Sequence, residues 1–146
     1  MISNILVPVD GSKQSDKALE FACDLANKYG AKLHVQHTVE VTMHEHAMFV
    51  GSAGFAFEAS DEDIQNAGKK VIEAAAKIID EHGCKLAETE IAHGSPTQNI
   101  LDRAKENDID MIVMGSRGLS DLGGLLLGSV SHKVSHLAEC TCVTVR

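Results

Sequence analysis

Short apolar runs alternate with longer amphipathic segments along the whole chain. The first run, residues 4–9 (NILVPV), is rich in β-branched residues and does not alternate with polar ones, which is typical of a strand buried on both faces. Further runs of strand character follow at residues 32–39, 85–94, 109–115 and 140–146. The run at 85–94 alternates more strongly, so we expect it nearer an edge of the sheet.

Amphipathic segments separate these runs, with apolar residues at helical spacing, and they cover residues 15–30, 60–83, 95–108 and 129–139. We expect Ser15 to cap the first helix and Gly30 to stop it. A capping box that begins at Ser60 marks the second helix, and Ser95, followed by a proline, marks the third.

This order of elements predicts a parallel sheet with helices on both faces, joined by right-handed crossovers. Ligands of such sheets bind beyond the carboxyl ends of the strands, where the strand order reverses. If the first and fourth strands are central neighbours, the segments PVDGS (8–12) and GSRG (115–118) meet there. Residues 39–60 fit neither period and are long for such a connection, which leaves two interpretations: a flap or partner surface, or a loop with a short helix tucked onto the core.

Composition narrows the class of protein. A chain of 146 residues, 44% of them hydrophobic, is expected to form one domain over residues 1–146, and its net charge of −8 argues against nucleic acid as a partner. The N-terminus does not read as a signal peptide, and no apolar run approaches the ~20 residues of a membrane span. We therefore expect a cytoplasmic protein without membrane insertion. The four cysteines match no zinc or CxxC pattern, so we expect buried free thiols.

The stretch GSRGLSDLGGLLLGSVS, residues 115–131, has an unusually bare backbone just before the last predicted helix. Backbone N–H groups bind phosphate best where no Cβ obstructs the approach and where a helix N-terminus adds positive potential. Ser129 is able to cap the helix and to offer its hydroxyl to a phosphate oxygen, and Ser131 in the first turn is able to do the same. The positive charge of Arg117 would offset the negative charge of the phosphates. The alternative is a flexible loop whose glycines only make turns. A Walker A lysine and a G-x-G-x-x-G fingerprint are both absent.

The spacing of this stretch resembles the nucleotide-binding signature of the universal stress protein family, G-x-x-G-x9-G-[ST]. Its four fixed positions fall on Gly115, Gly118, Gly128 and Ser129. The opening ILVPVDGS resembles the first strand and turn of the family, and GSPTQNILDRAKENDIDMIVMGSRG resembles its third helix and fourth strand. The order of elements agrees over all 146 residues.

The resemblance implies a doubly wound α/β sandwich of the adenine nucleotide α-hydrolase type, with strand order 3-2-1-4-5, and ATP as the ligand. By position, it places the adenosine against Pro8, Asp10 and the backbone of Thr38. It places the ribose and phosphates against Gly115, Ser116, Arg117, Gly118, Leu119, Ser120, Gly128, Ser129, Val130 and Ser131. Mg²⁺ is expected to arrive with the triphosphate rather than in a protein cage.

The function expected from this resemblance is nucleotide-dependent regulation in a stress response, acting on a protein partner such as a transporter. The resemblance also implies a homodimer formed through residues 141–145, or a tetramer. No nucleophile with an adjacent base is recognisable, and neither the histidines at 44–46 nor His132 with His136 has a third ligand, so we predict no catalytic or metal site. Three alternatives stay open: a slow ATPase or phosphotransferase at the same site, a flavodoxin-like FMN carrier, and an interaction module with an empty loop.

Overall fold

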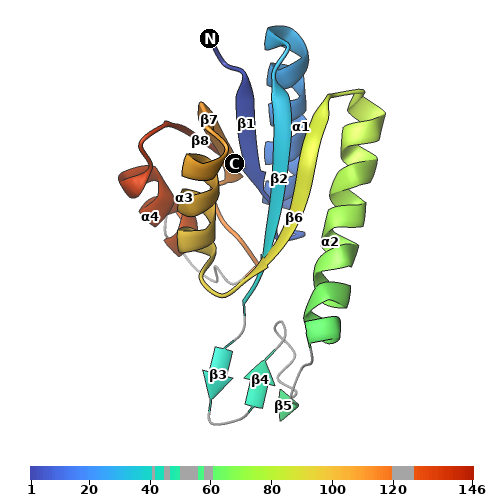
Figure 1. Cartoon of the computed structure of the whole chain (residues 1–146), viewed down its shortest axis with the longest axis vertical. Helices are drawn as coiled ribbons and strands as arrows, with labels where there is room; N and C mark the ends of the chain where they lie inside the picture. Colours follow the sequence, from blue (N-terminus) through green and yellow to red (C-terminus); the bar gives the residue numbers. More distant parts are fainter. Residues whose placement is uncertain (41, 45–46, 50–55, 58–60, 120–126) are drawn as a thin grey trace.

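The computed structural model describes residues 1–40, 42–44, 47–49, 56–57, 61–119 and 127–146. Its centre is a five-stranded parallel sheet with the spatial order β6-β2-β1-β7-β8 (Figure 1). The strands are β1 (Asn4–Pro8), β2 (Lys32–Val39), β6 (Leu86–His93), β7 (Met111–Gly115) and β8 (Thr141–Val145). Numbered along the chain, this order is 3-2-1-4-5, which confirms the predicted topology, and β6 lies at an edge as expected.

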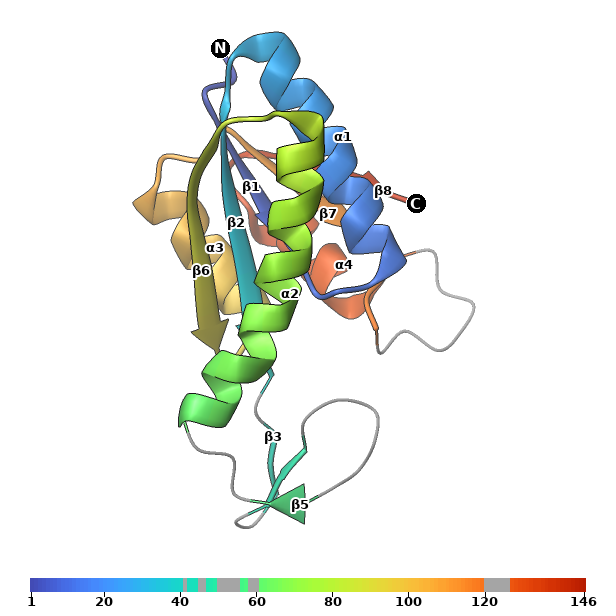
Figure 2. The same ribbon diagram turned by 90° about the vertical axis from the view of Figure 1, so that its right-hand side faces the viewer.

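Two pairs of helices cover the two faces of this sheet (Figures 1 and 2). Helices α1 (Lys13–Tyr29) and α2 (Asp61–His82) pack on one face, and α3 (Pro96–Glu106) and α4 (Ser129–Leu137) pack on the other. Alternate residues of β1 enter the two cores: Ile5 and Val7 face α1 and α2, whereas Leu6 faces α3 and α4. All three are fully buried, as expected of a central strand with covered faces.

The capping predictions have mixed outcomes. Ser12, not Ser15, caps α1, because the Ser12 hydroxyl accepts a bond from the Ser15 N–H at 3.2 Å. The predicted start was therefore wrong by most of a turn, and the Ser15 hydroxyl instead donates to the Ser12 carbonyl at 2.9 Å. Gly30 ends α1 in the left-handed region with φ of 69°, and Ser95 caps α3, both as predicted. The capping residue expected for α2, Ser60, lies outside the described residues.

Two of the four cysteines are paired, which corrects the expectation of free thiols. Cys23 lies in α1 and Cys84 follows α2, and their sulfurs form a disulfide across a Cα separation of 5.4 Å. The pair forms because α1 and α2 lie side by side on the same face of the sheet, a proximity that sequence spacing does not reveal. Cys140 and Cys142 are free and half-buried, and burial raises the pKa of both thiols.

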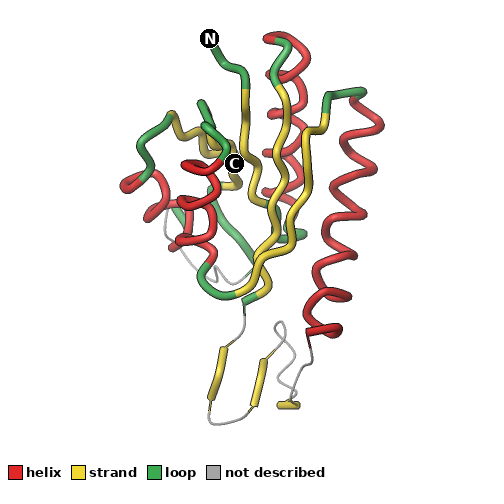
Figure 3. Tube along the Cα trace, viewed as in Figure 1, coloured by secondary structure: helices red, strands yellow, loops and turns green. Residues whose placement is uncertain are grey.

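The connection between β2 and α2 carries a second small sheet. Strands β3 (Thr42–His44), β4 (Ala47–Phe49) and β5 (Ala56–Phe57) pair antiparallel in that order. The described part of this connection is strand rather than the short helix offered as one interpretation. Figures 2 and 3 show the small sheet beyond the carboxyl ends of the main strands. Across the described residues, no helix is both long and apolar enough to cross a bilayer.

Candidate functional site

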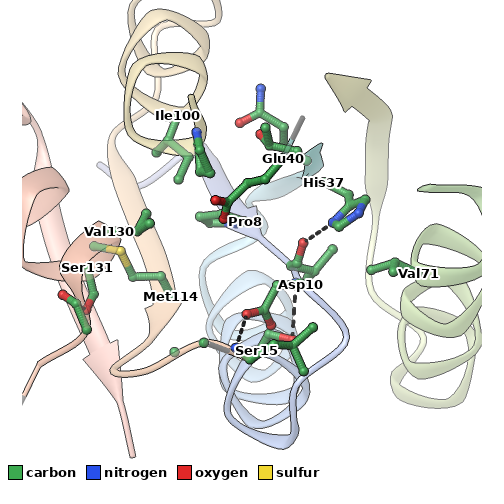
Figure 4. A pocket seen from close by; sticks show the side chains of 18 of the residues that line it. Pro8, Asp10, Ser15, His37, Glu40, Val71, Ile100, Met114, Val130 and Ser131 are labelled. Atoms are coloured by element: carbon green, nitrogen blue, oxygen red, sulfur yellow. Dashed lines mark hydrogen bonds between the residues drawn. The ribbon is translucent and has the colours of Figure 1, made fainter. Parts of the chain in front are cut away.

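A cavity of about 660 Å³ opens at the carboxyl edge of the sheet, where β1, β2 and β7 end and α4 begins (Figure 4). Its size falls within the range of about 300–1,000 Å³ that is common for small-molecule sites. Eleven of the thirteen predicted site residues line it: Pro8, Asp10, Thr38, Gly115, Arg117, Gly118, Leu119, Gly128, Ser129, Val130 and Ser131. The switch between β1 and β7 therefore coincides with the cavity, as expected for a doubly wound sheet.

The other two predicted residues do not line the described wall. Ser116 is buried behind the wall, where its N–H donates to the Val145 carbonyl at 2.7 Å and its carbonyl accepts from the Gly128 N–H at 2.7 Å. Its backbone thus ties the loop after β7 to both β8 and the start of α4. Ser120 lies outside the described residues.

Asp10 links the two segments that meet at the switch point. One carboxylate oxygen accepts from the Ser12 N–H at 3.0 Å, and the other accepts from the Leu119 N–H at 3.1 Å. The first bond closes the turn before α1, and the second holds the loop after β7 against the end of β1 (Figure 4). Asp10 therefore serves the architecture of the loop, whatever it contacts in a ligand.

Two glycines of the signature are required by packing within the protein. A Cβ on Gly118 would lie 2.6 Å from the Asp10 Oδ2 atom. A Cβ on Gly115 would lie 3.0 Å from both the main-chain carbon and the Cβ of Gln14. The sequence interpretation assigned the absence of side chains to the approach of phosphate. In this structure, α1 and the Asp10 carboxylate already occupy the space in question.

Gly128, rather than Ser129, is the N-cap of α4, so the predicted capping role of Ser129 is wrong. Gly128 is extended, with φ of −70° and ψ of 161°, and no described side chain caps the helix. The Ser131 hydroxyl lies 2.9 Å from the Ser116 carbonyl and 3.0 Å from the Gly128 carbonyl, so its proton is directed into the loop. The N–H groups of Ser129, Val130 and Ser131 belong to the first turn of α4, which has no intrahelical acceptors for them.

The end of β2 forms the opposite wall, which the motif analysis did not find beyond Thr38. Gln36, His37 and Glu40 all line the cavity. The His37 ring donates through Nδ1 to the Val9 carbonyl at 2.7 Å, which fixes the ring against β1 (Figure 4). The sequence does contain a sign of this wall, namely the polar side chains within the strand LHVQHT. Polar residues in a buried strand need hydrogen-bond partners or a ligand.

The charges around the cavity are of both signs. The carboxylates of Asp10 and Glu40 line it, and so does the exposed guanidinium of Arg117. Arg117 forms no ion pair with any residue that the structure describes. Positive potential is thus concentrated on the α4 side, where the guanidinium and the helix N-terminus coincide.

The universal stress protein family model matches residues 1–146, which is the entire chain. The chain belongs to this family. Among curated universal stress proteins, YxiE of Bacillus subtilis is 38% identical over 149 residues, an alignment that covers all of both chains. A solved universal stress protein from Archaeoglobus fulgidus has a TM-score of 0.73 at 26% identity, covering 100% of this chain and 95% of that one.

A further solved structure has the same fold and a bound nucleotide. It is described as the universal stress protein from Archaeoglobus fulgidus in complex with dAMP, and it superposes with a TM-score of 0.71 at 23% identity. The match covers 100% of this chain and 98% of that one. At this identity, the likeness establishes the universal stress protein fold of the chain.

Proposed function

We propose that the cavity at the carboxyl edge of the sheet binds an adenine nucleotide, and that ATP is the ligand. The observation that carries this proposal is the meeting of the glycine loop, the α4 N-terminus and Arg117 on one wall of a single cavity. The dAMP complex of a family member with the same fold supports an adenine nucleotide. The triphosphate is the expectation from the glycine signature.

The arrangement of the walls favours one orientation of the nucleotide. Phosphates are stabilised where unpaired N–H groups and positive potential coincide, and this condition is met at the α4 N-terminus beside Arg117. The base then extends over the end of β1 towards β2, where Pro8 and Thr38 line the cavity. Figure 4 shows Val130 and Ser131 on one side, His37 on the other, and Pro8 between them.

The first experiment is mass spectrometry of nucleotide released from freshly purified, undialysed protein. Calorimetry then compares ATP, AMP and adenosine on the full chain, with affinity expected to fall as phosphates are removed. The variant Arg117→Gln is expected to weaken ATP binding by at most about fivefold, because an exposed cation contributes at most about 1 kcal/mol, and to leave adenosine binding unchanged. Lys133→Gln is the matched control, since Lys133 is exposed on α4 but does not line the cavity. Absence of binding by every adenine compound would refute the proposal.

Hydrogen exchange tests the phosphate position separately. ATP is expected to protect the amides of residues 129–131, because a phosphate would accept hydrogen bonds from the first turn of α4. Adenosine is expected to give no such protection. Equal protection by ATP and adenosine would contradict the assignment of phosphates to this wall.

We propose that Mg²⁺ accompanies the triphosphate, because Asp10 and Glu40 bring negative charge to the same cavity. Asp10 is the carboxylate beside the glycine loop that would hold the ion. An affinity for ATP that is unchanged by removing Mg²⁺ with a chelator would contradict this assignment.

We further propose that the chain forms a homodimer through β8 and also binds a protein partner in cells. Nucleotide binding would regulate both associations. Strand β8 lies at one edge of the described five-stranded sheet, and unpaired edge groups favour a partner strand. Native mass spectrometry with and without ATP tests the homodimer, and a monomer under both conditions at micromolar concentration would contradict it. Affinity capture from cell lysate with and without ATP tests the protein partner, and the same set of captured proteins under both conditions would contradict regulation by the nucleotide.

A further inference from the structure

The Cys23–Cys84 disulfide joins α1 to the turn after α2, at the edge of the sheet opposite the cavity (Figures 1 and 2). Other contacts also hold these two helices together. Buried side chains of both helices belong to one apolar cluster, and the Asn27 side chain of α1 donates to the His82 carbonyl of α2 at 2.9 Å. A chain of 146 residues buries enough apolar surface to fold without a disulfide, so we expect the reduced chain to keep this fold.

The two sulfurs differ in how a reagent from solvent reaches them. Cys23 is fully buried, whereas Cys84 is partly exposed. In thiol–disulfide exchange a thiolate attacks one sulfur of the disulfide, from the side opposite the sulfur that leaves. For attack on Cys84, the leaving sulfur is the inner one, so the thiolate approaches from outside the protein. Attack on Cys23 would require an approach through the core.

The backbone holds Cys84 in position whether or not the disulfide is present. Gly83 ends α2 in the left-handed region with φ of 61°, and the Cys84 N–H donates to the Ile79 carbonyl at 3.3 Å. The Cys84 Sγ atom lies 3.7 Å from the same carbonyl, which gives the reduced thiol an acceptor. Cys23 would become a free cysteine in apolar surroundings, where free cysteines are common. The reduced pair is therefore expected to stay in place to form the bond again.

We propose that the Cys23–Cys84 disulfide is a reversible redox site, and that a protein dithiol reduces it by attacking Cys84. In the first step, a thiolate of the dithiol forms an S–S bond with Cys84, the Cys23–Cys84 bond breaks, and the Cys23 thiolate takes up a proton. In the second step, the other thiolate of the dithiol attacks the first dithiol sulfur, and Cys84 leaves and is protonated. Two electrons and two protons pass from the dithiol to the pair. An oxidised dithiol restores the bond by the reverse steps.

The first step is expected to be the slower of the two, because Cys23 leaves into apolar surroundings that disfavour a thiolate. Reduction removes the covalent link between α1 and α2 without altering any residue that lines the cavity. The end of α2 and the turn after it are then expected to exchange amide hydrogens faster. This redox site is independent of the proposed nucleotide binding.

Trapping of the mixed disulfide is the direct test, and it uses the full wild-type chain purified without reductant. The probe is a dithiol protein of the CxxC class whose second cysteine is replaced by serine, so that the second step cannot occur. We expect a covalent complex, and peptide mapping by mass spectrometry is expected to place its bond on Cys84. A bond mapped to any other cysteine would overturn the proposal. A complex that forms only after the chain is unfolded would overturn it as well.

Two single variants compare the sulfurs under native conditions. Cys23→Ala leaves Cys84 as a thiol, and Cys84→Ala leaves Cys23. A thiol reagent is expected to label Cys84 about tenfold faster than Cys23, because exposure controls the access of the reagent. Urea unfolding shows whether each variant is folded, and the trapping experiment on wild type requires neither of them. Equal labelling rates in two folded variants would contradict the assignment of Cys84 as the attacked sulfur.

Reduction and reoxidation of the folded wild-type chain test reversibility. The intact dithiol protein is expected to reduce the pair without a change in far-UV circular dichroism, and its oxidised form is expected to restore the disulfide. Hydrogen exchange should become faster at residues 80–85 of the reduced chain and stay unchanged at residues 129–131. Loss of the fold on reduction, or a pair that does not form its bond again, would show that the disulfide is purely structural and would refute the proposal.

Discussion

Replacing Gly118 with alanine tests whether the glycine signature serves the protein or its ligand. The new Cβ would lie 2.6 Å from the Asp10 Oδ2 atom, whereas ordinary contacts begin at 3.4 Å, so the two must separate by about 0.8 Å. That shift stretches the bond from the Leu119 N–H, now 3.1 Å, beyond the hydrogen-bonding range. A hydrogen bond to a carboxylate contributes about 1.5–3 kcal/mol, and the partial exposure of Asp10 reduces this to about 1–2 kcal/mol.

A double-mutant cycle isolates this contact. Gly118→Ala, Asp10→Ala and the double variant are compared with wild type by urea unfolding, and thermal melts should show a fall of about 3–6 °C for Gly118→Ala alone. Once Asp10 is alanine, the added Cβ has no carboxylate to displace, and Gly118→Ala is expected to cost almost nothing. The coupling energy is therefore expected to equal the cost of the single substitution, about 1–2 kcal/mol.

The same four proteins are assayed for ATP affinity. If Gly118 serves Asp10, Gly118→Ala weakens ATP binding in wild type but has no further effect in the Asp10→Ala background. An equal loss of stability in both backgrounds would refute the packing argument. If Gly118→Ala still lowers ATP affinity in the Asp10→Ala background, the result would support the original interpretation that the absence of a side chain at Gly118 lets the phosphate approach.

Further predictions concern the scaffold. Gly68→Ala in α2 is expected to lower the free energy of unfolding, measured in urea, by about 1 kcal/mol. The new Cβ would lie 2.5 Å from the Ile91 Cγ2 atom, and this collision, about 1–3 kcal/mol, outweighs the stability that alanine adds to a helix. A gain in stability would contradict this prediction. The backbone N–H groups of Ser3 and Asn4 donate to Asp110 and lower the pKa of its carboxyl group, so the ionised carboxylate stabilises the fold. Wild type should therefore be more stable than Asp110→Asn near neutral pH and lose that advantage as the pH falls below about 4, measured by unfolding over an acid pH series. An advantage that grows in acid would contradict this prediction. Alkylation of unfolded, unreduced protein should leave Cys23 and Cys84 unmodified, and reduction should lower the free energy of unfolding by about 2–4 kcal/mol; modification of all four thiols would exclude the disulfide.

The elements that hydrophobic pattern alone controls could be predicted closely. Strand β2 has the predicted bounds, because the run from Lys32 to Val39 lies between a helix stop and an irregular segment. The parallel sheet and the place of the cavity followed from the alternation of strands and helices, since carboxyl ends of parallel strands share one edge, whereas the strand order was predicted from the family resemblance. The choice between Ser12 and Ser15 was not available from the sequence, because both precede the same apolar face and either hydroxyl is able to cap.

The parts of the site that were missed depend on contacts between distant segments. Gln36 reaches the cavity wall only because β2 lies beside β1, and its amide nitrogen is bonded to Glu90 on β6. The reason for Gly118 likewise lies 108 positions away in Asp10. Glycine spacing located a loop that lines the cavity, but the physical cause of the spacing required three-dimensional packing.

The wall of the cavity draws on residues from Pro8 near one terminus to Ser131 near the other. No fragment of the chain contains the site, so occupancy and folding are thermodynamically linked across the entire polypeptide. A compound at a hundred times its dissociation constant would raise the free energy of unfolding by about 2.7 kcal/mol. The melting temperature of the intact chain therefore reports directly whether a given compound binds in the cavity, and the measurement requires no label.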